Sequence, residues 1–214
     1  MPKTQGSLSE FAYNALKEKL LTLESGAHLS SRQFALEIGM SYTPVREAFL
    51  RLQKEGTLKQ IPNVGYFIAS MDINDILQVF QVRECIEPFV LQRIITRITP
   101  SHIMLMRGFV EEQKQALNMK DITKYMKLDI KIHEVLLDIY GNPHIKSAYH
   151  MIREKYMFCS NRIALAFNPD GLDEHIRLVD AIESGNLELS LESMNSHIEN
   201  AKKRIMEGYI RVIG

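Results

Sequence analysis

The chain has 214 residues, 45% of them hydrophobic, and its 26 basic and 26 acidic residues leave no net charge. This length suits one large domain or two small ones, and the apolar fraction is sufficient for a sizeable core. No apolar run reaches the roughly 18 residues that a membrane-spanning helix needs, and the N-terminus lacks the features of a signal peptide. Cys85 and Cys159 lie far apart and predict reduced, buried thiols rather than a disulfide framework. We therefore expect a cytoplasmic protein with no membrane partner.

The first seventy residues predict a winged helix-turn-helix. Apolar residues recur at helical spacing in three segments, and alternation with turn residues marks two short strands after them. Ser30 begins the second helix with a capping pattern, and Gly39 ends it. Thr43 is the expected cap of the third helix, with Pro44 at its first position, where a proline costs nothing. The helices are expected over residues 8–23, 30–39 and 43–56, and the strands over 58–61 and 66–69.

The polar residues of this unit indicate DNA binding. Burial of the apolar stripe of the third helix leaves its N-terminal end outside, which is the end of a recognition helix that enters the major groove. There Arg46 can offer a bidentate fork to guanine or brace a phosphate. Residues 1–70 carry a net charge of +2, which suffices for DNA only if the cations are well aimed or the protein is a dimer. The alternative is a small helical domain whose arginines are only solvated. The candidate DNA-binding residues are Arg32, Ser41, Tyr42, Thr43, Arg46 and Gly65.

The amino-acid sequence of the turn and the third helix favours the DNA-binding interpretation. Residues 41–48 read Ser-Tyr-Thr-Pro-Val-Arg-Glu-Ala, and Leu52, Gly56 and the turn Pro62-Asn63-x-Gly65 follow. This order resembles the N-terminal domain of GntR-type bacterial transcription regulators. By that resemblance, Arg32, Thr43, Arg46 and Gly65 match the DNA-contacting positions of the family. Tyr42 departs from the pattern, because the family usually has Arg there, and a tyrosine cannot form a bidentate fork.

From residue 71 onward, helical patterns predict an antiparallel bundle of about six helices, so the fold class is mostly α. Polar residues interrupt the apolar faces of this bundle: Asp129 and His133, four apart on one helix, then His175, with His197 at the edge of the last apolar stripe. An ionised aspartate that faces a core is costly unless it is paired or binds a metal. Hydrogen-bonded core histidines and a simple Asp129–His133 pair are the alternatives.

The same residues carry a second resemblance. Asp129-x-x-x-His133, then Glu174-His175 with Ala181-Ile182 and Gly185, then His197, resembles the effector-binding helical domain of the FadR-like (FCD) branch of GntR regulators, although Ile132 replaces a more usual Phe. In metal-containing members one Asp and three His of this pattern bind the ion, which implies Asp129, His133, His175 and His197 as ligands. Three imidazoles and one carboxylate favour Zn²⁺, with Ni²⁺ or Mn²⁺ as alternatives.

The resemblance also implies an effector, a small organic acid held partly by the metal and partly by arginine. Arg83 matches a family position, and Asn161 and Arg162 are further candidates. The alternative for Arg83 is an ordinary surface ion pair with Glu87, four residues later.

Together these features predict a homodimeric, metabolite-responsive transcription regulator, taken here as a repressor, that binds a pseudo-palindromic duplex. Residues 1–70 would bind DNA, and residues 71–214 would bind the effector and dimerise. The first alternative is a metal-dependent hydrolytic enzyme, since a metal with an open position can activate water. No glutamate base is evident for it, because Glu174 is expected on another helix face than His175. A helical domain without a metal is the second alternative.

Overall fold

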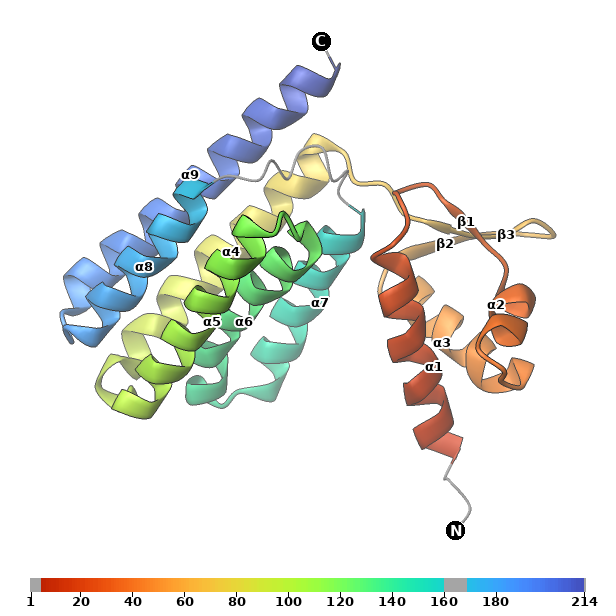
Figure 1. Ribbon diagram of the computed structural model, residues 1–214, viewed down its shortest axis with the longest axis horizontal. Helices are drawn as coiled ribbons and strands as arrows, with labels where there is room; N and C mark the ends of the chain where they lie inside the picture. Colours follow the sequence, from red (N-terminus) through yellow and green to blue (C-terminus); the bar gives the residue numbers. More distant parts are fainter. Residues whose placement is uncertain (1–4, 160–168, 214) are drawn as a thin grey trace. The chain divides into compact units, whose positions relative to one another are not determined.

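The computed structural model describes residues 5–159 and 169–213 (Figure 1). The chain divides into two compact units, one made mainly of residues 5–72 and the other mainly of residues 73–153 and 169–213. Within these described segments, no helix combines the length and apolar character that crossing a membrane would require.

The first unit is a winged helix-turn-helix, as predicted. Its helices are α1 (Gln5–Leu20), α2 (Ser31–Glu37) and α3 (Tyr42–Lys54), and its strands are β1 (His28–Leu29), β2 (Leu58–Ile61) and β3 (Gly65–Ile68). The strands form an antiparallel sheet in the order β1-β3-β2, in which Leu29 pairs with Tyr66 and Gln60 with the same residue on the other side (Figure 1). The strand β1 was not predicted, because two residues are too few to show an alternating pattern.

Aromatic side chains join the helices of this unit to its sheet. Phe49 of α3 lies with its ring centroid 5.9 Å from that of Phe34 in α2 and 4.8 Å from that of Tyr66 in β3. Phe49 is fully buried, together with Leu16 of α1 and Leu52 of α3. Burial of this stripe fixes which face of α3 remains in solvent.

The second unit is a helical bundle. It comprises α4 (Ile73–Ile94), a short 3-10 turn η1 (Ile95–Arg97), α5 (Pro100–Asn118), α6 (Ile122–Tyr140), the part of α7 (Pro143–Cys159) up to Arg153, α8 (Pro169–Glu183) and α9 (Leu187–Ile213). Five of these helices pack in a closed ring, α4 on α6, α6 on α5, α5 on α8, α8 on α9 and α9 on α4 (Figure 1). Side chains from all five can therefore meet at its centre.

The predicted helix boundaries in this unit have identifiable causes. The Asp121 side chain accepts from Lys124 N–H at 2.9 Å and caps α6, which ends at Gly141 in the left-handed conformation.

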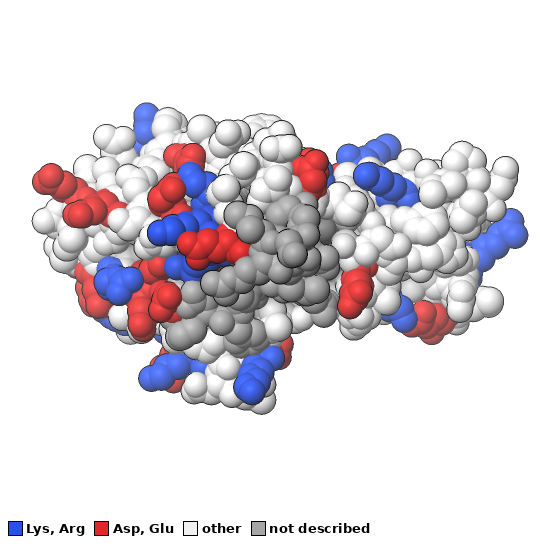
Figure 2. Space-filling model, turned by 90° about the horizontal axis from the view of Figure 1, so that it is seen from above, with Lys and Arg blue, Asp and Glu red and all other residues white. Residues whose placement is uncertain are grey.

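The prediction of a buried Cys85 thiol is wrong, because Cys85 lies exposed on α4. The side chain of Cys159 lies outside the described residues. Over the helical unit, basic and acidic side chains are intermixed on the face drawn in Figure 2.

Candidate functional site

The exposed end of α3 carries most of the residues predicted to bind DNA. Val45, Ala48, Phe49 and Leu52 are buried, and this leaves Arg46 exposed in the first turns of the helix. The N-cap is Ser41 rather than the predicted Thr43, and the Ser41 side chain makes no capping hydrogen bond. The first N–H groups of α3 are therefore open to an anion such as a phosphate.

Tyr42, the residue that departs from the family pattern, lies beside Arg32. The Arg32 guanidinium carbon is 6.0 Å from the centre of the Tyr42 ring, a distance at which a cation and an aromatic face attract each other. Arg32 is exposed on α2, and Tyr42 is 43% exposed at the start of α3. The structure thus places Arg32, at the start of α2, beside Tyr42, and Ser41, Tyr42, Thr43 and Arg46 lie at the start of α3.

Gly65 has a structural role in the wing. Its φ of +144° is a conformation that only glycine adopts without strain. A Cβ atom there would lie 2.5 Å from His28 Nε2 and 3.0 Å from the carbonyl oxygen of Leu29. Both neighbours belong to β1, and the Leu29 oxygen cannot swing aside because it is backbone. Glycine at this position therefore lets β1 pair with β3.

We expect Gly65→Ala to lower the free energy of unfolding of the first unit by about 3 kcal/mol, because backbone strain and overpacking act together. Gly39→Ala is the matched control, since Gly39 has a φ of +65° but a Cβ atom added there would meet no neighbour within 4 Å. It should cost only about 1 kcal/mol. Denaturant unfolding of the two variants measures the difference, and equal losses would contradict a steric role for Gly65.

A buried cluster lies at the centre of the helical ring. One ligand atom each from Asp129, His133, His175 and His197 can be chosen so that all four lie within 4.8 Å of one another. The three histidines are 1–2% exposed, and their ring centroids are 4.5 to 5.4 Å apart. The helices α6, α8 and α9 supply them. The structure therefore brings together all four residues that were predicted as metal ligands.

Each histidine is oriented by an oxygen atom at its Nδ1 nitrogen. Glu87 Oε2 lies 2.8 Å from His133 Nδ1, Gln113 Oε1 lies 2.8 Å from His175 Nδ1, and Glu174 Oε2 lies 3.1 Å from His197 Nδ1. An acceptor at Nδ1 favours the ring proton there and the lone pair on Nε2, which is the usual arrangement of a metal-binding histidine. The contact of Glu87 with His133 is close but lacks hydrogen-bond geometry, and Arg83 Nη2 lies within 3.4 Å of Nε2 of His133 and His197. Glu87, Gln113 and Glu174 are all buried. None of the three was predicted to support the site.

The pairing of His175 with Asp129 fits a cation between them. The Gln113 amide nitrogen lies 3.4 Å from the carbonyl oxygen of Tyr125, which directs the amide oxygen to His175 and makes Nδ1 of that ring the donor. His175 Nε2 then carries a lone pair and no proton. It is buried, has no hydrogen-bond partner among the described residues, and faces Asp129 Oδ1 at 3.2 Å. Two acceptors at this distance repel unless a positive charge lies between them.

The protonation states suit metal binding. Burial lowers the pKa of His197 to about 3, and the neighbouring His175 acts in the same direction. Burial also lowers the pKa of His133, against the opposing effect of Glu87. Although burial acts to raise the pKa of Asp129, the charge of Arg153 holds it well below its ordinary value. Neutral imidazoles and an ionised carboxylate are the forms that bind a divalent metal.

Two buried arginines flank the cluster. Arg83 is 2% exposed, so the alternative of a surface pair is wrong, although the partner is Glu87 as that alternative supposed, at 2.6 Å. Arg153 of α7, which was not predicted, forms an ion pair with the second oxygen of Asp129. Asn161 and Arg162, the other two effector candidates, lie outside the described residues.

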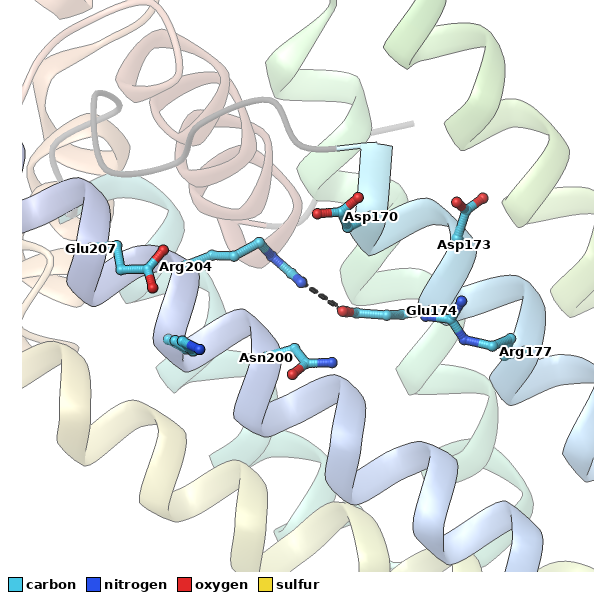
Figure 3. A pocket seen from close by; sticks show the side chains of 8 residues that line it. Asp170, Asp173, Glu174, Arg177, Asn200, Arg204 and Glu207 are labelled. Carbon is cyan, nitrogen blue, oxygen red and sulfur yellow. Dashed lines mark hydrogen bonds and ion pairs between the residues drawn. The ribbon is translucent and has the colours of Figure 1, made fainter.

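A polar groove of about 410 Å³ runs between α8 and α9, and Glu174 forms part of its wall (Figure 3). Arg204 binds both oxygens of Glu174 there, at 2.6 and 2.7 Å. Glu174 was expected on another helix face than His175, away from the cluster. It instead lies at the cluster through its bond with His197, because α9 packs against that face of α8.

Gln113→Leu should lower the affinity for Zn²⁺ by about 10–100-fold, because His175 loses the acceptor that fixes its ring. Competition with a chromogenic chelator measures this affinity. Gln115→Leu is the matched control, since Gln115 is exposed on the same helix. A similar affinity in both variants would show that the oxygen of Gln113 does not matter.

Comparisons with known proteins find a matching family for each of the two parts of the chain. Residues 78–200 match the FCD domain, and residues 8–68 match the family described as bacterial regulatory proteins, gntR family. An uncharacterized HTH-type transcriptional regulator of Bacillus subtilis, YdhC, is 27% identical over 208 residues, and the match covers 92% of each chain. The gluconate operon transcriptional repressor of the same species is 22% identical over 190 residues, which cover 86% of this chain and 78% of the relative.

The fold has a close counterpart among solved structures. The structure named E. coli McbR/YncC superposes with a TM-score of 0.85 at 19% sequence identity. The superposition covers 98% of this chain and 100% of the other. At this identity the likeness concerns the fold.

Proposed function

The chain belongs to the GntR family of bacterial regulatory proteins and carries an FCD domain, and we propose that it is a metabolite-responsive repressor that binds operator DNA as a homodimer. The family consists of DNA-binding transcription regulators and not of enzymes. We assign DNA binding to residues 1–70, and effector binding and dimerisation to residues 71–214. A cytoplasmic location follows from that function. Repression is supported by relatives such as the gluconate operon repressor.

DNA recognition is assigned to the exposed end of α3. Arg46 would read a guanine edge or a phosphate, and the uncapped N–H groups beside Ser41 and Thr43 would hold a phosphate. Arg32 would contact the backbone or a base edge next to Tyr42, and Gly65 would bring the wing close to the duplex. In a dimer, two such ends would face two half-sites of a pseudo-palindrome.

The helical unit is proposed to hold a divalent metal, with Zn²⁺ preferred and Ni²⁺ or Mn²⁺ as alternatives. Asp129 and the Nε2 atoms of His133, His175 and His197 would be its ligands. The observation that carries this proposal is the convergence of one ligand atom from each of the four residues within 4.8 Å, together with an oxygen atom near the Nδ1 atom of each histidine. When bound, the metal would supply a positive charge that attracts the carboxylate of a small organic acid.

The acid is proposed to act by binding two arrangements of the regulator unequally, since a ligand with equal affinity for both changes nothing. Arg83 would hold it together with the metal, and Asn161 and Arg162 are proposed as further contacts. The hydrolytic alternative lacks a free base, because Glu174 is already bound by Arg204 and His197.

The test begins with a duplex that the purified protein selects from a random DNA library. Titration of a broad panel of small carboxylic acids into Zn²⁺-loaded protein, with fluorescence anisotropy of the labelled duplex, should reveal at least one acid that changes its affinity. Elemental analysis of protein purified without an affinity tag checks the metal separately. A protein that selects no duplex, or whose DNA affinity is indifferent to every acid, would contradict the corresponding part of the proposal.

A further inference from the structure

The guanidinium of Arg83 lies against two of the atoms that a metal would use. Its Nη2 is 3.2 Å from His197 Nε2 and 3.4 Å from His133 Nε2. The Nδ1 atoms of the same two rings face carboxylate oxygens, of Glu174 and Glu87. Carboxylates only accept hydrogen bonds, so the rings carry their protons on Nδ1, and Arg83 donates to both Nε2 atoms.

A lone pair that accepts an N–H cannot at the same time bind a metal. A divalent ion in the cluster would also lie close to the positive charge of the guanidinium, in an interior where repulsion is weakly screened. We propose that Arg83 is the resident cation of the metal-free site and that it competes with the metal for His133 and His197. This inference rests on the proposed metal site and adds to it an exchange between two cations.

Contacts with Glu87 can hold the Arg83 side chain in place while a metal replaces its bonds to the histidine rings. Nε donates to Glu87 Oε1 at 2.6 Å, and the Tyr149 hydroxyl donates to the same oxygen at 2.9 Å. Glu87 therefore holds the guanidinium through Nε, and it also accepts from Nη2 at 3.4 Å through Oε2. The metal must replace only the contacts of Nη2 with the two rings. Metal binding would turn Nη2 away from the rings and leave one of its N–H groups as a donor, beside the contact with Glu87 Oε2.

This exchange predicts the charge of the effector and the order in which the metal and the effector bind. Asp129 is already paired with Arg153, and Glu87 with Arg83, so the metal enters a centre whose carboxylates have partners. An anion would then satisfy both the metal and the released Nη2. The acid is accordingly expected to bind after the metal and to bind poorly to metal-free protein, in which His133 and His197 occupy Arg83.

Removal of the competing cation should strengthen metal binding, the reverse of what loss of a supporting residue does. Arg83→Gln and Arg83→Met are each expected to bind Zn²⁺ at least about tenfold more tightly than the wild type, because one charge-assisted hydrogen bond or more no longer opposes the metal. Arg83→Lys keeps the charge but loses the planar fork, so its Zn²⁺ affinity should lie between those of the wild type and the uncharged variants. Arg93→Gln, at an exposed position on the same helix, is the control for a general loss of positive charge and should leave the affinity unchanged.

Chelator competition with Zn²⁺ measures all five proteins, and circular dichroism of the metal-free forms shows which are folded. If the uncharged variants do not fold, nitrogen NMR of the arginine side chains in the wild type replaces them, and the Arg83 signal should shift when Zn²⁺ is added without any acid. Equal or weaker Zn²⁺ binding by the folded uncharged variants, or an unmoved Arg83 signal in Zn²⁺-loaded protein, would overturn the exchange. A wild type that takes up no Zn²⁺ would instead overturn the metal site, and the exchange with it.

Discussion

Arg46→Ala is expected to weaken binding to the selected operator duplex by about 1–3 kcal/mol, the value of a specific arginine contact to a base. Arg46 is exposed in the first turns of α3, whose buried stripe fixes it outward, so the substitution removes a contact without disturbing the core. Fluorescence anisotropy with the selected duplex and with a scrambled duplex measures the loss. A loss confined to the selected duplex would indicate base reading, and an equal loss on both would indicate a phosphate contact.

The matched control is Lys54→Ala. Lys54 is an exposed cation in the last turn of the same helix, so it tests whether charge alone matters or whether its place at the recognition end does. Operator affinity should change by less than about 0.5 kcal/mol, as for an ordinary surface substitution. An Arg46→Ala protein that binds the operator as tightly as the Lys54→Ala protein would remove α3 from the DNA interface.

His175→Ala is expected to lower the Zn²⁺ affinity by more than about 100-fold, because loss of a ligand exceeds the effect of losing an outer partner. The stabilisation of the wild type by excess Zn²⁺, seen as a rise in Tm, should largely disappear with it. Operator binding should remain largely intact without any acid, since His175 belongs to the other unit. Elemental analysis and thermal melts with and without Zn²⁺ measure the effect.

His144→Ala controls for the loss of an imidazole. His144 is exposed near the start of α7 and lies outside the cluster, so its variant should keep the metal content and the Zn²⁺-dependent rise in Tm of the wild type. Retention of the metal by His175→Ala at the level of His144→Ala would mean that the four-residue cluster does not hold it.

The sequence was most informative where a motif is local. The winged helix-turn-helix, the helical bundle and the membership of the GntR family and its FCD branch are confirmed. They could be predicted because helix caps, prolines and apolar periodicity depend on residues that are close in the sequence. The cap of α3 was placed at Thr43 instead of Ser41, a shift within the usual uncertainty of helix ends. Burial of Cys85 was wrong, because a single residue on a helix does not reveal which side the neighbouring helices cover.

The candidate site was predictable in its ligands but not in their surroundings. Periodicity placed His133 and His175 on inward faces, yet it cannot tell which residue of another helix will lie opposite. Gln113 and Glu87 could have been found, since each interrupts an apolar stripe of its own helix in the same way as Asp129 does. Arg153 gave a weaker signal, and its partner became clear only from packing. The roles of these residues toward a metal, and those of the DNA-facing residues, stay predictions.

The position of Glu174 links the interior of the bundle to its surface. The carboxylate touches the His197 ring on one side and the partly exposed Arg204 on the other, so two hydrogen bonds connect the surface to this buried ring. Dissolved salts and substitutions at position 204 can thus alter the electron density of a deeply placed ring while every apolar contact stays as it is.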